Sequence, residues 1–223
     1  MALMKRGDSS PRIDELLQPE RKLWAEGFCF IAGVDEAGRG PLAGPVAAAA
    51  VVLPRGIELP DVFDSKQLSD SARRELRDEI YGLPGVQIGL SLIDAQTIDK
   101  INILQATHRA MREAVGKLEN VDCVLVDGLA VHGFGVEARN LVKGDALSAS
   151  IAAASIVAKV ARDDVMIELD RQYPGYGFAV HKGYGTAAHL RALQEYGASP
   201  VHRRSFRPVR EVVEPPPEQL ELL

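Results

Sequence analysis

Two adjacent carboxylates near the start of the chain are the first candidates for chemistry. Asp35 ends an apolar, β-leaning segment at 28–35, and Glu36 follows it shortly before a glycine- and proline-rich turn at 38–44. Because neighbouring side chains of a regular strand point to opposite faces, the two acids can share a site only if the strand ends or bulges there. The alternative interpretation of this pair is a solvated hairpin tip.

Two further acids lie at places where a predicted element ends or begins. Asp127 follows the wholly apolar segment 123–126, and open α/β sheets usually keep their ligand sites at the carboxyl ends of buried strands. Asp145 lies where a long helix is predicted to begin. The alternatives are an Asx-type turn with Gly128 for Asp127 and helix capping for Asp145.

These four acids favour one kind of metal chemistry. Carboxylates without a cysteine- or histidine-rich spacing favour hard, oxygen-bound Mg²⁺ or Mn²⁺ over zinc. Two such ions about 4 Å apart can activate water, orient a phosphate and stabilise the leaving oxygen. The chain has no Gly-Lys-Ser/Thr phosphate loop, no Gly-x-Ser-x-Gly elbow and no dinucleotide fingerprint. The acids therefore indicate metal-dependent phosphoryl chemistry.

The elements that must position these acids alternate between strands and helices. Four segments that are apolar or alternate with a period of two are predicted as strands: 28–35, 45–53, 86–92 and 123–126. Three segments are predicted as helices: 70–81, 103–118 and 145–173. Ser69 and Asn102 are the expected N-caps of the first two helices. A weakly patterned, helix-compatible stretch precedes the first strand.

Length and composition bound the class of protein. The chain has 223 residues, of which 46% are hydrophobic and 26% charged, so we expect a folded globular protein. Its longest apolar run, at 46–53, is far shorter than the ~20 residues of a membrane-spanning helix, and no secretory signal is recognised. We therefore expect a cytoplasmic protein without a membrane partner. Cys29 and Cys123 are predicted to be small buried hydrophobes.

Charge is distributed unevenly along the chain. The net charge is −5, yet residues 171–210 contain seven basic residues and a single acid, Glu195. A basic region beside acidic ones suits a protein that holds a polyanion at one surface and binds metal at another. The alternative is a solvated helix face followed by a tail.

A series of motifs containing these residues resembles the bacterial ribonuclease HII family, the type 2 ribonucleases H. The matching segments occur in order along most of the chain: 33–45, 64–66, 101–104, 126–128, 143–145, 152–156, 181–186 and 202–206. The resemblance implies an α/β, ribonuclease H-like fold with a central mixed sheet flanked by helices and additional C-terminal helices. We accordingly expect an N-terminal extension at 1–27, a catalytic domain at 28–210 and a flexible tail at 211–223.

The resemblance also implies an activity. Asp35, Glu36, Asp127 and Asp145 would be the catalytic acids that bind Mg²⁺ or Mn²⁺. The substrates would be RNA–DNA hybrids and duplex DNA containing single ribonucleotides. Cleavage would fall on the 5′ side of the ribonucleotide and leave 3′-hydroxyl and 5′-phosphate ends, and a monomer is the family expectation.

Substrate contacts are expected at the glycine-rich turns and at basic residues. Gly38 and Gly40 allow close backbone approach, which testing for one 2′-hydroxyl requires, whereas the alternative is a hairpin with a solvated Arg39. By resemblance Tyr184 packs on the sugar beside the ribonucleotide, but it could instead be a half-buried loop tyrosine. His181 could assist product release or hydrogen-bond the loop. Five basic residues fit phosphate contacts, although each could be a simple surface charge: Lys66, Lys143, Lys182, Arg203 and Arg204.

Two other classes of function compete with a nuclease. A metal-dependent phosphatase acting on small phosphoesters would use the acids but not the basic C-terminal third or the Gly-Arg-Gly turn. A non-catalytic hybrid-binding module would use the basic surface but none of the acids. Because the sequence contains both features, it favours the endonuclease.

Overall fold

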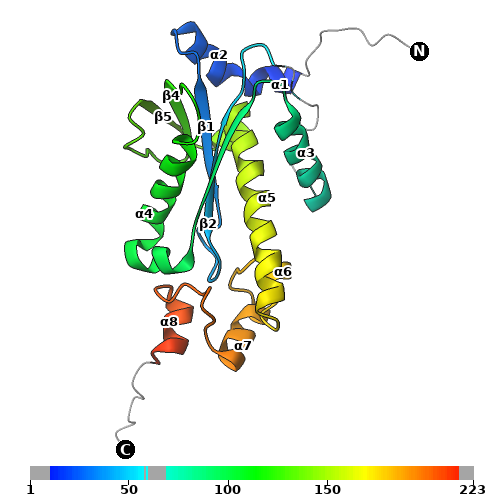
Figure 1. The fold of residues 1–223 in the computed structure, drawn as a ribbon, viewed down its shortest axis with the longest axis vertical. Coiled ribbons are helices and arrows are strands. Elements are labelled where there is room, and N and C mark those ends of the chain that lie inside the picture. Colours follow the sequence, from blue (N-terminus) through cyan, green and yellow to red (C-terminus); the bar gives the residue numbers. More distant parts are fainter. Residues whose placement is uncertain (1–10, 58, 60–68, 216–223) are drawn as a thin grey trace, which may run out of the picture.

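The computed structural model describes residues 11–57, 59 and 69–215, and a five-stranded sheet forms its centre (Figure 1). The strands are β1 (Ile31–Ala37), β2 (Val46–Val52), β3 (Gln87–Ile93), β4 (Cys123–Asp127) and β5 (Glu137–Leu141). Their order is β3-β2-β1-β4-β5. β1, β2 and β3 pair antiparallel, whereas β4 lies parallel to β1 and β5 parallel to β4, so the sheet is mixed.

Helices cover both faces of the sheet and extend beyond it. They are α1 (Pro11–Leu16), α2 (Gln18–Ala25), α3 (Asp70–Gly82), α4 (Ala95–Val115), α5 (Ala149–Gln172), α6 (Phe178–His181), α7 (Ala187–Tyr196) and α8 (Arg207–Val213). Figure 1 shows α4 and α5 on opposite sides of the sheet, α1 and α2 at one end of the molecule and α6 to α8 at the other. The predicted mixed sheet with flanking and additional C-terminal helices is confirmed.

The core is built on the small and β-branched residues of β2, all seven of which are buried. Ala49 and Val51 pack with α5 on one face, whereas Ala48 and Ala50 pack with α4 on the other. Short alanine side chains let both helices lie close to the sheet, so a central strand needs no alternation of apolar and polar residues. The uninterrupted apolar run predicted as a strand is explained by this burial on two faces.

A glycine in β1 controls how α5 meets the sheet. A Cβ at Gly33 would overlap the backbone of Ser150, at the start of α5. Only glycine permits this approach, since every other residue would push the helix away from the strand. The start of α5 is therefore held against β1 two residues before Asp35.

The predicted elements are largely present, with three differences. Strand β5 was not predicted because its residues are polar and mostly exposed, and it forms by pairing with β4. The long helix begins at Ala149, with Ser148 as its N-cap, so Asp145 lies outside it in a short 3₁₀ turn, Gly144–Ala146. Ser69 caps α3 as expected, since its side chain accepts the backbone N–H of Ala72.

The third difference is in α4. Asn102 interrupts this helix with φ of 65° and ψ of 164°, and its Oδ1 accepts the N–H of Gln105 at 3.0 Å. Asn102 therefore caps the second part of α4, as predicted. A first part, which Asp94 caps, was missed, and the helix ends at Val115, earlier than expected.

Residues near both chain ends pack against the rest of the protein. Helix α8 crosses the predicted boundary at residue 210, and its Val209 is fully buried. Leu23 of α2 is also buried, against Ile31 of β1. The predicted burial of Cys29 is wrong, because Cys29 is exposed in the loop before β1. The rest of the predicted tail, 216–223, lies outside the described residues. None of the described helices is long and apolar enough to cross a membrane.

Candidate functional site

Three of the four predicted acids lie where the pairing of β1 with β4 stops. The expected end or bulge of β1 is absent, since Asp35 and Glu36 pair in regular register with β2. The pairing of β1 with β4, however, stops at Val34 and Val126, one residue before Asp35 and Asp127. Beyond that point β1 has no neighbour on its β4 side, so both acids of the strand can approach Asp127 without a bulge. We call Asp35, Glu36 and Asp127 the acid edge.

The three carboxylates of the acid edge are close enough for their charges to interact. Burial and the charges of Glu36 and Asp127 raise the pKa of Asp35 from 3.8 to about 7, against a hydrogen bond from Ser155 that lowers it. Burial also raises the pKa of Glu36, and the charge of Asp127 adds to the effect, although Arg39 opposes it from 3.1 Å. Ionising each of these buried carboxylates therefore costs free energy, and a bound cation would offset that cost.

The donor set fits a hard dication. Among the described residues, no three His, Cys, Asp or Glu side chains are already arranged as a metal cage. The acid edge nevertheless offers only carboxylate oxygens, the ligands that Mg²⁺ and Mn²⁺ prefer. Burial, with a smaller contribution from the neighbouring acids, raises the pKa of Asp35, and a bound dication would oppose both effects.

Asp145 is linked to the acid edge through its neighbour in the chain. The N–H of Gly144 donates to Asp127 Oδ1 at 2.6 Å, which fixes the 3₁₀ turn beside β4. The Asp145 side chain itself is exposed and makes no hydrogen bond or ion pair within the described part of the chain. The structure therefore places the segment of Asp145, but not its carboxylate, against the other acids.

The prediction that Arg203 contacts phosphate is wrong. Arg203 is fully buried, and its guanidinium donates to backbone carbonyls of the glycine-rich turn, residues 38–45. The acceptors are the carbonyl oxygens of Gly38 at 2.6 Å, Arg39 at 2.9 Å, Gly44 at 3.0 Å and Pro45 at 3.1 Å. A side chain with this many internal acceptors has no free face for a ligand, and it holds the turn instead.

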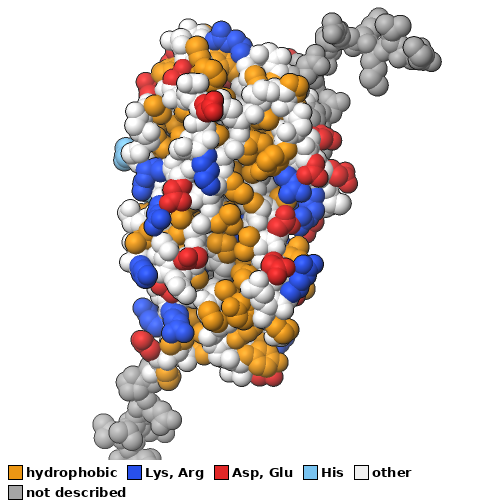
Figure 2. Space-filling view, in the orientation of Figure 1, with side chains coloured by type: hydrophobic (Ala, Val, Ile, Leu, Met, Phe, Trp, Pro, Cys, Tyr) orange, Lys and Arg blue, Asp and Glu red, His pale blue; other side chains and the backbone are white. Residues whose placement is uncertain are grey.

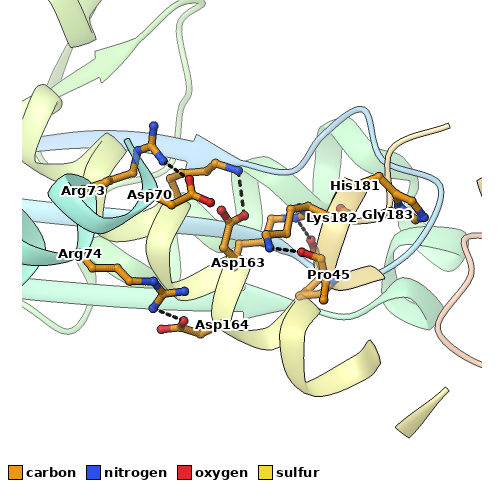
Figure 3. Close-up of polar contacts among 12 residues, drawn as sticks. Pro45, Asp70, Arg73, Arg74, Asp163, Asp164, His181, Lys182 and Gly183 are labelled. Atoms are coloured by element: carbon orange, nitrogen blue, oxygen red, sulfur yellow. Dashed lines mark hydrogen bonds and ion pairs between the residues drawn. The ribbon is translucent and has the colours of Figure 1, made fainter. Parts of the chain in front are cut away.

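A second buried arginine, which the sequence did not single out, joins the turn to the loop of Tyr184. Arg162 of α5 donates to the carbonyls of Pro45 at 2.9 Å and Lys182 at 3.0 Å, residues labelled in Figure 3. It also donates to Ala43 at 3.2 Å. The available signal was an arginine in a mostly buried, alanine-rich stretch of α5. Gly38, with φ of +91°, must be glycine because a Cβ would overlap this side chain.

The turn and the Tyr184 loop face each other across a cavity. The N–H of Leu42 donates to the carbonyl of Gly183 at 2.7 Å, and a Cβ at Gly40 would lie 3.6 Å from the Tyr184 ring. The cavity measures about 340 Å³, and Tyr184, Glu36 and Lys159 are among its lining residues. Tyr184 is 47% exposed, so its ring is available to a ligand that also reaches Glu36.

Other predicted substrate residues have mixed environments. Lys143 and Arg204 are exposed, as phosphate contacts require. The ammonium of Lys182 donates to the carbonyl of Ala179, which occupies one of its three donors. Lys66 lies outside the described residues.

His181 favours the loop interpretation. Its Nε2 lies 2.7 Å from the carbonyl oxygen of Tyr176, and its Nδ1 accepts the N–H of Gly183 at 3.2 Å. His189 and His202, predicted to be structural, are buried and lie 3.0 Å apart at their Nε2 atoms. Both ring nitrogens of His181 are thus used to support the loop before Tyr184.

Comparison with known proteins assigns the fold and then the family. The ribonuclease H2 of Pyrococcus horikoshii OT3 superposes with a TM-score of 0.64 at 25% identity, over 82% of this chain and 96% of that one. The more distant Bst-RNase HIII, solved in complex with Mn²⁺, gives 0.59 at 18% identity, over 95% and 75%. The protein is therefore of the ribonuclease H-like fold class.

Sequence comparison is more specific. The family model described as Ribonuclease HII matches residues 32–209. The ribonuclease HII of Geobacter metallireducens is 54% identical over 204 residues, which cover 88% of this chain and 95% of that protein. The chain belongs to the ribonuclease HII family.

Proposed function

We propose that the protein is an endoribonuclease that hydrolyses the RNA strand of RNA–DNA hybrids and incises duplex DNA on the 5′ side of a single ribonucleotide. The products carry 3′-hydroxyl and 5′-phosphate ends, and the enzyme acts as a monomer in the cytoplasm. The observation that carries the proposal is the acid edge beside a rigidly held glycine-rich turn, in a chain of the ribonuclease HII family.

Asp35, Glu36 and Asp127 would hold Mg²⁺ or Mn²⁺, and Asp145 would join them from the adjacent 3₁₀ turn. When bound, such an ion stabilises developing charge on the phosphoryl oxygens and lowers the pKa of a bound water. Because its pKa is raised, Asp35 holds a proton near neutral pH, and it must release this proton to bind the ion. Asp127 is oriented by the N–H of Gly144, and Glu36 is steadied by Arg39.

Recognition of a ribonucleotide follows from the planarity of the peptide bond. Arg203 orients two peptide units of the turn, because its guanidinium donates to the carbonyls of Gly38 and Arg39 and holds both carbonyls toward the interior. In a trans peptide the N–H points away from the carbonyl, so the N–H groups of Arg39 and Gly40 are directed outward. Neither donates to another described residue. These two donors suit a hydroxyl or phosphate oxygen, and Tyr184 would pack on the adjacent sugar.

Basic side chains provide the remaining attraction for a nucleic acid. Figure 2 shows Lys and Arg side chains gathered over α8, at the end of the molecule that carries the glycine-rich turn. Arg204, Arg207 and Arg210 are exposed there. Together with Lys143 and Lys182 they would contact phosphates, which position a duplex without reading its sequence. Lys66 remains a predicted contact.

A cleavage assay tests the proposal. A duplex with one labelled ribonucleotide, incubated with Mg²⁺, should be cut once, and EDTA should prevent the cut. An all-DNA duplex of the same sequence should remain intact. A phosphatase would instead hydrolyse small phosphoesters and leave the duplex unchanged, whereas a binding module would retain the duplex without cutting it. Absence of product at saturating Mg²⁺ and Mn²⁺ would contradict the proposed activity.

A further inference from the structure

A buried carboxylate lies in the segment predicted as an N-terminal extension. Glu20 belongs to α2, twelve residues before the match to the family model begins at residue 32. It is only 1% exposed. Burying an ionised carboxylate carries a high desolvation cost unless hydrogen bonds compensate it, whereas an apolar side chain would fill the same space without that cost. The contacts of Glu20 should therefore explain its presence.

Those contacts are all with the first turn of α5. Glu20 Oε1 accepts the Ser148 hydroxyl at 2.6 Å, and it accepts both the N–H at 3.0 Å and the hydroxyl at 2.6 Å of Ser150. Ser148 is itself the N-cap of α5. A negative charge at this position interacts favourably with the helix dipole and satisfies donors that the helix leaves open. Glu20 thus adds a second, long-range cap to α5.

The capped turn is connected to the acid edge by two short hydrogen bonds. The N–H of Ser148 donates to the carbonyl of Gly144 at 2.8 Å, and the N–H of Gly144 donates to Asp127 Oδ1 at 2.6 Å. Asp145 lies between these two anchors. The 3₁₀ turn that carries Asp145 is therefore held at one end by Asp127 and at the other by the residues that Glu20 binds.

The same contacts also fix the turn relative to β1. Ser150 rests on Gly33, where a Cβ would overlap its backbone, and Asp35 follows two residues later. Glu20 lies against the side chain and N–H of Ser150. The other carboxylate oxygen, Oε2, is buried without a hydrogen-bond partner among the described residues. All the hydrogen bonding of this side chain is thus directed at one place, the junction of α5 with both acid-bearing strands.

We propose that Glu20 is a positioning residue for the metal site. By capping α5 from α2, it holds the 3₁₀ turn that carries Asp145 against Asp127. This inference rests on the proposed metal-dependent function. It makes α2 a working part of the catalytic unit and not a dispensable extension.

Direct measurement of Mn²⁺ binding by calorimetry, on the full chain without substrate, tests the role. Glu20→Ala should weaken Mn²⁺ binding about tenfold or more, as loss of residues supporting metal ligands does in other sites. The Mg²⁺ concentration for half-maximal cleavage should rise by a similar factor, while KM for the duplex changes little. Glu20→Gln should retain most of the affinity, because its amide oxygen can accept the same hydrogen bonds.

A matched control separates a positioning role of Glu20 from a general loss of stability. Leu76→Ala removes a buried side chain of α3 from the core beside α5 and should lower stability without changing Mn²⁺ affinity. Wild-type Mn²⁺ affinity in folded Glu20→Ala, or a loss in Leu76→Ala as large as in Glu20→Ala, would overturn the inference. Equal losses in Glu20→Gln and Glu20→Ala would also overturn it.

A milder variant covers the case in which Glu20→Ala does not fold. Ser150→Ala removes one of the three donors to Glu20, and it should still weaken Mn²⁺ binding by about threefold; unchanged affinity would then overturn the inference. Asp127→Asn serves as the reference for the site itself. If Asp127→Asn binds Mn²⁺ as the wild type does, the proposed metal site has failed, and that result is distinct from a failure of Glu20.

Discussion

The acid edge and the glycine-rich turn are neighbours with opposite electrostatic designs. The acid edge contains Asp35, Glu36 and Asp127, and burial together with the like charges of its neighbours raises the pKa of Asp35 to about 7. The turn is held by Arg162 and Arg203, whose buried guanidinium groups donate to backbone carbonyls on several sides. The acid edge has excess negative charge that a bound cation would neutralise. The turn, in contrast, already has its hydrogen bonds formed before any ligand binds.

This difference separates chemistry from recognition. The burial and mutual repulsion of the acids support the dication site that we propose. The turn needs a defined shape in advance, because recognition by backbone N–H groups depends on the orientation of each peptide plane. Buried arginines suit this task, since each presents several donors in a fixed plane. The comparison predicts different consequences when each region is altered.

The largest effect is expected from removing a carboxylate of the acid edge. Asp127→Asn or Asp35→Asn should reduce cleavage to below about 1% of the wild-type rate, because a neutral amide is a poor ligand for a hard dication. Without metal, and at a pH above the raised pKa of about 7 where Asp35 is ionised, Asp35→Asn should raise the melting temperature, since it removes a buried repulsive charge. Single-turnover cleavage with saturating Mg²⁺ and thermal unfolding in EDTA measure the two effects. Substantial activity in either variant would show that the ligand assignment is incorrect.

The turn should respond in the opposite way, through stability. Arg203→Met leaves the carbonyls of Gly38, Arg39, Gly44 and Pro45 without this donor, which should lower the free energy of unfolding by about 3 kcal/mol or more. Arg204→Met is the matched control at an exposed neighbour, with an expected change within about 0.5 kcal/mol. Urea denaturation compares the two. Similar changes in both variants would remove the distinction between the buried and the surface arginine.

A smaller effect is expected at the ring that faces the turn. Tyr184→Ala should slow cleavage at a lone ribonucleotide by roughly ten- to a hundredfold, the worth of a stacking contact of about 1–3 kcal/mol. Affinity for all-DNA duplex should hardly change. Arg39→Ala should lose less, because Arg203 keeps the backbone of the turn in place. Parallel losses of cleavage and all-DNA affinity in the Tyr184 variant would assign this residue to loop structure.

The smallest effect concerns protons at the acid edge. Because the folded pKa of Asp35 is about 7, above the ~3.9 of an unfolded chain, its contribution to metal-free stability is complete below pH 4 and is lost as the pH rises through 7. Binding a dication requires the ionised form, so Mn²⁺ should release about one proton near pH 6 and few near pH 8. Calorimetry in buffers of different ionisation enthalpy measures this release. Equal release at both values would contradict the raised pKa.

Much of the fold was predictable because burial leaves a local record in the sequence. The apolar runs of β2 and β4 and the alternation in β3 predicted strands that the structure contains. Strand β5 left no such record, since its exposed polar residues form a strand only through pairing with β4. The acid edge was predictable for a related reason, because each acid directly follows an apolar strand segment.

The sequence alone thus determined four of the five strands, the main helices, the family resemblance and the candidate acids. Only the tertiary structure decided the roles of Glu20, Arg162 and Arg203. In the sequence each is an ordinary charged residue, and Arg203 was predicted to lie at the surface. Their partners are more than a hundred residues away for most contacts, from Glu20 to Ser150 and from Arg203 to Gly38. The local hydrophobic pattern indicates whether a position is buried. It does not indicate which distant residue pairs with a buried charge, because folding of the whole chain brings the two together.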